Sequence, residues 1–101
     1  MKIESQGERL SVSEIPELTA ANSADFRDGV RSALIDSSSV IEINLSETRF
    51  IDSSGLGALF ALYRTTAERD GAVLRLLYPI PEIEQLLRLT QMDHLFEIVR
   101  R

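Results

Sequence analysis

The chain has 101 residues, is 44% hydrophobic and 27% charged, and has a net charge of −5, which indicates one folded domain and disfavours nucleic-acid binding. It contains no cysteine, so disulfides, thiolate catalysis and cysteine-based metal sites are excluded. Because no apolar window approaches a membrane span and residues 1–6 do not resemble a signal peptide, we expect a single cytoplasmic domain over residues 1–101 that does not insert into membranes.

The N-terminal third predicts two strands and a helix. Residues 2–6 are predicted as a first strand that ends in a turn at Gly7. Residues 10–13 alternate at period two, as a half-buried strand does, and Pro16 follows that strand. Asn22 is expected to cap a helix. The apolar positions of this helix recur at helical spacing, at Phe26, Val30, Ala33 and Leu34.

The middle of the chain predicts a strand–helix–strand unit. Residues 40–45 form the clearest strand because β-branched side chains alternate there. Residues 50–51 lead into a second helix, which Asp70-Gly71 ends, and residues 73–78 are the next strand. This order predicts a right-handed crossover with parallel strands. The expected core stripe of the helix is Leu56, Leu59, Phe60, Tyr63 and Ala67.

Four further positions on this second helix lie off the expected stripe. They are Ala58, Ala61, Leu62 and Thr65. Small and apolar residues there fit packing beneath a neighbouring helix, which we favour, or a face that contacts a partner.

The C-terminal part predicts a third helix and a short final element. Pro81 suits the first position of a helix, and residues 95–99 are either a helix end or a last strand. The predicted fold class is therefore α/β, a single mixed β-sheet of four to five strands packed against about four helices. Binding sites in such sheets collect at the carboxyl ends of strands, and residues 52–57 lie at such an end.

The segment Asp52-Ser53-Ser54-Gly55-Leu56-Gly57 passes from a strand into a helix within a few residues. One serine is predicted to cap the helix, whose amides and dipole favour an anion. Each glycine costs roughly 0.5–1 kcal/mol relative to alanine inside a helix, which is understandable if something approaches the backbone closely. Phosphorylation of either serine would add about −1.5 to −2 charges. The residues also fit an ordinary helix start, and they do not choose between the two serines.

Other chemistry finds little support in the sequence. His94 is the only histidine, so no second imidazole is available for a metal site. The chain has no Gly-x-Ser-x-Gly elbow, no phosphate-binding loop and no dinucleotide fingerprint. We predict a protein that is not an enzyme, with no catalytic residue, no cofactor and no metal.

Residues 40–57 resemble the signature of the STAS domain, which is shared by sulphate transporters and anti-sigma-factor antagonists. The resemblance continues through residues 68–71, 74–76 and 87–93, and so covers nearly the whole chain. A freestanding domain of this length is similar to the bacterial anti-sigma-factor antagonists. That resemblance implies a protein that binds a kinase-like anti-sigma factor, is released when the kinase phosphorylates a serine, and is restored by a serine phosphatase.

The resemblance also assigns roles to individual residues. It makes Ser53 the phosphorylation site, with Ser54 the less favoured choice, and it makes the partner-binding residues Asp52, Ser53, Ser54, Gly55, Leu56 and Gly57. Pro16 and Thr19 stand where the family usually has the glycine and the aspartate of Gly-Glu-Leu-Asp, and Gln91 replaces a glycine. The missing aspartate leaves a second function open, a STAS-type accessory or scaffold subunit of a membrane transporter or signalling complex without a phosphoswitch.

Overall fold

The computed structural model describes all 101 residues. They form a five-stranded mixed sheet in the order β1-β2-β4-β6-β7, a two-stranded sheet of β3 and β5, three α-helices and one 3-10 turn. The strands are β1 (Lys2–Gln6), β2 (Arg9–Ser13), β3 (Glu17–Leu18), β4 (Val40–Asn44), β5 (Phe50–Ile51), β6 (Val73–Leu77) and β7 (Glu97–Val99). The helices are α1 (Ser23–Ala33), α2 (Ser53–Ala67) and α3 (Pro81–Leu89), followed by the 3-10 turn η1 (Met92–His94).

The predicted mixed sheet is confirmed, while the expected number of about four helices is slightly too high. β1 pairs antiparallel with β2, and the other neighbours in the large sheet are parallel. The crossover from β4 through α2 to β6 is the predicted unit. The C-terminal alternatives are resolved in favour of a last strand, because η1 makes only a single turn before β7.

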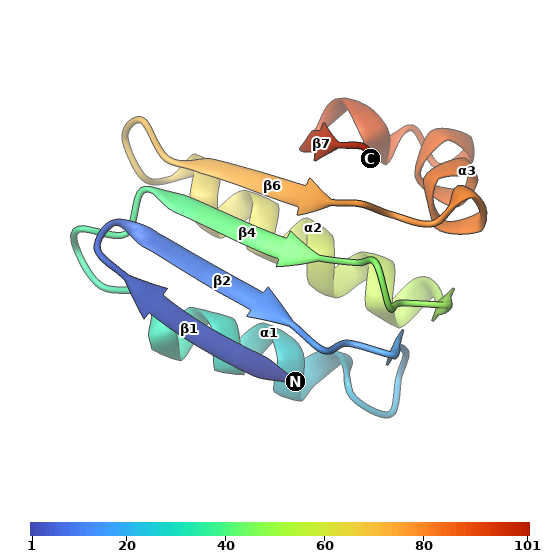
Figure 1. The fold of residues 1–101 in the computed structure, drawn as a ribbon, viewed down its shortest axis with the longest axis horizontal. Helices are drawn as coiled ribbons and strands as arrows, with labels where there is room; N and C mark the ends of the chain where they lie inside the picture. The colour runs from blue at the N-terminus through green and yellow to red at the C-terminus, as the bar shows by residue number, and fades with distance from the viewer.

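Both long helices cover one face of the large sheet, and Figure 1 views the sheet from the opposite face. Alternate residues of β2, β4 and β6 point toward the helices and are buried, as the period of two requires. The core therefore lies between the sheet and the helices. Its largest fully buried side chains are Leu10, Val12, Leu18, Phe26, Val30, Ile41, Ile43, Leu45, Leu59, Leu62, Leu76 and Leu87.

The predicted core stripe of α2 is partly wrong. Phe60 and Ala67 are exposed, whereas Ala58 and Leu62 are buried. The reason is that α2 packs against the sheet on one side and against α1 on another, so its buried surface is rotated toward α1. Of the four residues off the predicted stripe, Ala58 and Leu62 are buried, and Thr65 accepts a hydrogen bond from Arg31 of α1.

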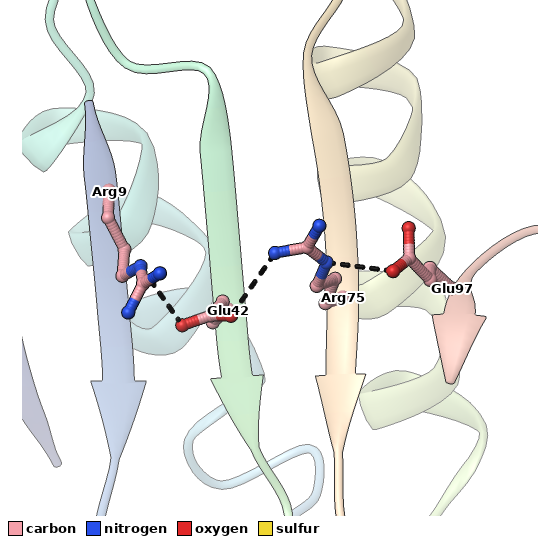
Figure 2. A network of polar contacts seen from close by, with 4 residues as sticks. All are labelled: Arg9, Glu42, Arg75 and Glu97. Carbon is pink, nitrogen blue, oxygen red and sulfur yellow. Dashed lines mark hydrogen bonds and ion pairs between the residues drawn. The ribbon is translucent and has the colours of Figure 1, made fainter. Parts of the chain in front are cut away.

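A row of alternating charges crosses the face of the sheet that the helices leave open (Figure 2). Glu42 lies 3.4 Å from Arg9 and 3.5 Å from Arg75, and Arg75 lies 2.9 Å from Glu97. The hydrogen bond and charge of Glu97, and then those of Glu42, raise the pKa of Arg75 above its ordinary value. Exposed ion pairs stabilise a fold little, but here each charge has a partner of opposite sign, so the row is electrically balanced.

Gln91 follows α3 in the left-handed conformation, with φ of 59° and ψ of 20°. Glycine adopts this conformation without a steric cost, and it is the residue that most often ends a helix in this way. The structure therefore explains why a glycine suits this position in the STAS pattern. The glutamine keeps the same turn into η1.

A buried threonine ties together the two loops that lead into β3 and β5. Thr48 is fully buried, and its hydroxyl donates a hydrogen bond to the carbonyl of Ile15. The amide of Arg49 donates to the carbonyl of Pro16 at 3.0 Å. These bonds hold the small sheet in place beyond the ends of β2 and β4. No local pattern in the sequence indicates this role of Thr48.

We predict that Thr48→Val destabilises the protein by about 1–3 kcal/mol, because the isosteric side chain leaves the buried Ile15 carbonyl without this donor. Urea unfolding followed by circular dichroism measures the change. Thr90→Val is the matched control, since Thr90 is exposed and water can replace its hydroxyl. Equal losses in the two variants would contradict the role assigned to Thr48.

Candidate functional site

The segment Asp52–Gly57 lies at the carboxyl edge of the large sheet, as predicted. β2, β4 and β6 point toward this edge, and the small sheet lies beyond it (Figure 1). β5 pairs parallel with β3 and leads directly into Asp52, after which α2 begins at Ser53. The start of α2 is therefore held next to the loop between β3 and α1.

Asp52, and not a serine, caps α2. Its Oδ1 accepts a hydrogen bond from the amide of Gly55 at 2.9 Å, and its Oδ2 accepts one from the amide of Ala20 at 3.0 Å. The expectation that a serine hydroxyl forms the cap is thus wrong, because a carboxylate has two acceptor oxygens and can serve the helix and the neighbouring loop together. The cap joins segments that are 32 residues apart in the sequence.

These two hydrogen bonds favour the negatively charged form of the Asp52 side chain. The Gly55 amide, and next the Ala20 amide, lower the pKa of Asp52 below its ordinary value of 3.8. The carboxylate is therefore ionised at neutral pH, where it faces the positive end of the α2 dipole.

The loop that reaches Asp52 is folded by Asn22. Its Oδ1 accepts a hydrogen bond from the Thr19 amide at 2.8 Å, and its Nδ2 donates to the Glu17 carbonyl at 2.8 Å. Asn22 stands at the N-cap position of α1, but its side chain makes no capping bond to that helix. The predicted cap is therefore wrong in mechanism, because the side chain serves the preceding turn.

Ser53 and Ser54 are both exposed in the first turn of α2. Because Asp52 supplies the cap, neither serine hydroxyl is needed for that role. Ser53 is thus an accessible hydroxyl at the positive end of a helix, directly after an ionised carboxylate.

The two glycines of the segment differ in their surroundings. A Cβ on Gly55 would lie 2.1 Å from the carbonyl oxygen of Leu18 and 2.8 Å from Cγ2 of Ile51, so the first turn of α2 rests directly on the backbone of β3. A Cβ on Gly57 would have no heavy atom within 4 Å. Packing inside the protein therefore explains Gly55, whereas Gly57 leaves the exposed surface of α2 flat one turn after Ser53.

The predicted partner-binding residues thus separate into two groups. Ser53, Ser54 and Gly57 form the exposed surface of the segment, while Gly55 is buried. Asp52 and Leu56 are half-buried, and Leu56 packs against the core. The role of Ala20 could not be predicted from the sequence, because this residue contributes only its backbone amide.

The remaining candidate residues add no second centre. His94 lies in η1 with its side chain 81% exposed, 3.8 Å from Asp93. The side chains of histidine, aspartate and glutamate form no group of three or more that could hold a metal ion. None of the helices has the length and apolar character needed to cross a membrane.

The two glycines should respond in opposite directions to alanine. We expect Gly55→Ala to destabilise the protein by roughly 1–3 kcal/mol, because the new methyl group meets the Leu18 backbone. We expect Gly57→Ala to stabilise it by about 0.5–1 kcal/mol, because alanine is the better helix former and open space receives its methyl group. Thermal unfolding of both variants tests the pair, and a loss of stability in Gly57→Ala would contradict the geometry.

Asp52 should contribute stability in a pH-dependent way. A group whose pKa is lowered by folding stabilises the folded state above its unfolded pKa, and this contribution is lost as the pH falls through the folded-state pKa. Asp52→Asn keeps only one acceptor oxygen and no charge. We therefore expect the wild type to be more stable than Asp52→Asn at pH 7 and the difference to shrink below about pH 3.8.

Urea unfolding at a series of pH values between 7 and 2 measures this difference. Asp36→Asn is the control, since Asp36 is exposed in the loop after α1. A difference between wild type and Asp52→Asn that stays constant down to the lowest pH would show that the charge of Asp52 is not involved.

Comparisons with known proteins agree on the fold. The STAS domain family matches residues 3–101, and no curated protein gives a significant match. A proposed anti-sigma factor antagonist of Thermotoga maritima superposes with a TM-score of 0.88 at 22% identity, covering 99% of this chain and 86% of that one. The anti-sigma factor antagonist SpoIIAA in its unphosphorylated form gives 0.75 at 20% identity, with coverage of 99% and 87%.

The phosphorylated form of SpoIIAA, the Bacillus cell fate determinant, gives a TM-score of 0.74 at 20% identity, with coverage of 99% and 91%. At such identities these likenesses establish a shared fold. The family match spans all but the first two residues of the chain. The protein therefore belongs to the STAS domain family.

Proposed function

We propose that this protein is an anti-sigma-factor antagonist that works by partner switching. In its unphosphorylated form it binds a kinase-like anti-sigma factor in the cytoplasm, phosphorylation of Ser53 releases it, and a serine phosphatase restores it. The observation that supports this most directly is the exposure of Ser53 at the start of α2, where Asp52 has taken over the cap. The protein acts as a substrate and a competitor and not as an enzyme.

The fold is suited to carry the modification. A phosphoryl group on Ser53 adds about −1.5 to −2 charges. The dipole of α2 favours a negative charge there by typically 0.3–1 kcal/mol. The adjacent Asp52 carboxylate opposes the phosphoryl group, but that carboxylate is held by the amides of Gly55 and Ala20. The domain should therefore stay folded after phosphorylation.

A partner bound at this surface would tolerate a phosphoryl group on Ser53 far less than the free domain does. Ser53 and Gly57 are four residues apart and so lie on the same side of α2, where the missing side chain of Gly57 lets another backbone come close. A new charge against such a surface costs several kcal/mol if it meets like charge or loses its water. About 2.8 kcal/mol already weakens binding a hundredfold.

The named relatives point in the same direction. SpoIIAA is named as an anti-sigma factor antagonist, the Thermotoga maritima protein is a proposed one, and SpoIIAA has been solved in its unphosphorylated and phosphorylated forms. Residues 1–101 would form one domain in this pathway, with the interface made by Asp52, Ser53, Ser54 and Gly57 around the buried Gly55 and the half-buried Leu56.

The phosphorylation step is tested with the kinase-like anti-sigma factor from the same genome and ATP. Mass spectrometry should find one phosphoryl group on Ser53, none in Ser53→Ala, and unchanged phosphorylation in Ser54→Ala. Binding to the kinase should fall at least about a hundredfold in Ser53→Asp but remain in Ser53→Ala. A protein that gains no phosphoryl group, together with equal binding by the wild type and Ser53→Asp, would refute the proposal.

Thr19 supports one alternative function. It stands where the family usually has an aspartate, and it lies in the loop whose next residue, Ala20, is bonded to Asp52. The loop beside Asp52 therefore lacks the second carboxylate that the family usually places there for a kinase to use. In the alternative, the same surface is a fixed docking site of an accessory or scaffold subunit in a transporter or signalling complex. Ser53→Ala and Ser53→Asp would then bind their partner equally.

A further inference from the structure

Two arginines on the open face of the sheet and two on the helices differ in their partners. Arg9 and Arg75, on the open face, are both paired with Glu42 (Figure 2). Arg31 on α1 and Arg64 on α2 form no ion pair with any carboxylate. In a protein with a net charge of −5, these two arginines line one hollow with a single carboxylate, that of Glu68, which forms an ion pair with neither of them.

Both arginines line one hollow between α1 and α2. This hollow, which we call the α1–α2 groove, has a volume of about 420 Å³ and is lined by Arg31, Phe60, Ala61, Arg64, Thr65 and Glu68. Arg31 Nε donates a hydrogen bond to Oγ1 of Thr65 at 3.2 Å, and Thr65 Oγ1 donates to the carbonyl of Ala61 at 3.0 Å. Arg31 is thus held across the groove by one of its five donors, and the terminal donors of its guanidinium remain for a ligand.

Phe60 gives the groove an apolar wall. Its side chain is 42% exposed, and its ring centre lies 6.1 Å from that of Tyr63, which in turn meets Phe96 edge-on at 6.0 Å. A single exposed aromatic residue is common on protein surfaces. Here, however, the ring lies beside Tyr63 and lines the same hollow as two arginines that have no carboxylate partner, a combination of residue types typical of binding hot spots.

The groove continues the surface that carries Ser53. Gly57 lies four residues after Ser53, Phe60 and Ala61 lie three and four residues after Gly57, and Arg64 lies four residues after Phe60. These residues therefore lie along one side of α2. Gly57 is open to solvent, and no side chain of its own separates the serine from Phe60. A partner that covers Ser53 can therefore reach the groove.

We propose that the α1–α2 groove is the second half of the partner interface, and that it takes an acidic segment of the partner with an apolar side chain packed on Phe60. Carboxylates of that segment pair with Arg31 and Arg64. Glu68 at the end of the groove repels any acidic residue that extends beyond Arg64, which sets the register of the segment. The inference rests on the proposed function, because it takes the anti-sigma factor as the partner.

The test measures association and dissociation of the unphosphorylated protein with the kinase-like anti-sigma factor by surface plasmon resonance at low and high salt. Phe60→Ala should weaken binding about tenfold or more, mainly through faster dissociation. The double variant Arg31→Glu/Arg64→Glu should associate more slowly, and its association rate should depend less on salt than that of the wild type. Thermal unfolding confirms that each variant is folded.

Two control variants on α3 match these changes. Arg88→Glu alters an exposed arginine, and Leu89→Ala removes a side chain that is 75% exposed. Both should bind as the wild type does. If the groove variants also bind as the wild type does while Ser53→Asp does not bind, the groove is not part of the interface and the proposed function stands. If the wild type itself fails to bind the kinase, both proposals fall.

Discussion

The carboxylate of Asp52 is the interaction on which the site depends. By accepting hydrogen bonds from Gly55 and Ala20, it starts α2 and fastens the β3–α1 loop to that start. The same contact brings Gly55 against the Leu18 carbonyl, where only a glycine fits. Because the side chain of Asp52 makes the cap, the hydroxyls of the two serines that follow are not needed to start the helix. Either serine can therefore be modified without the loss of a hydrogen bond that holds the helix.

Local patterns in the sequence were enough to predict most of the fold. Alternation and helical periodicity, with Pro16, Gly71 and Pro81 as boundaries, located most of the strands and the three helices. These signals arise within a few neighbouring residues, so one sequence contains them. The buried side of α2 was not predictable in this way, because it depends on how the helix packs against α1 and the sheet, which come from other parts of the chain.

The candidate site likewise has some features that neighbouring residues determine and others that depend on residues distant in the sequence. Its position after β5 and its glycines could be predicted from residues 50–57, and the STAS resemblance singled out Ser53. The cap could not, since a serine and an aspartate are both good N-caps and the choice depends on Ala20, which is distant in sequence. The hydroxyl of Thr48 and the carbonyl of Ile15 are likewise bonded across 33 residues. The residues around each of them form no pattern that predicts this hydrogen bond.

The charges of the molecule are arranged so that the two ends of the proposed interface act separately. At a rise of about 1.5 Å per residue, Ser53 and Arg64 lie about 16 Å apart along α2, roughly twice the Debye length of about 8 Å at physiological salt. A phosphoryl group on Ser53 is therefore screened from Arg64 and does not cancel the attraction of the groove for an acidic segment. Under the proposed function, phosphorylation would act at short range, on the partner surface that packs against the first turn of α2. The proposed groove would then set how fast an acidic partner associates, while the state of Ser53 would set how long that partner stays bound.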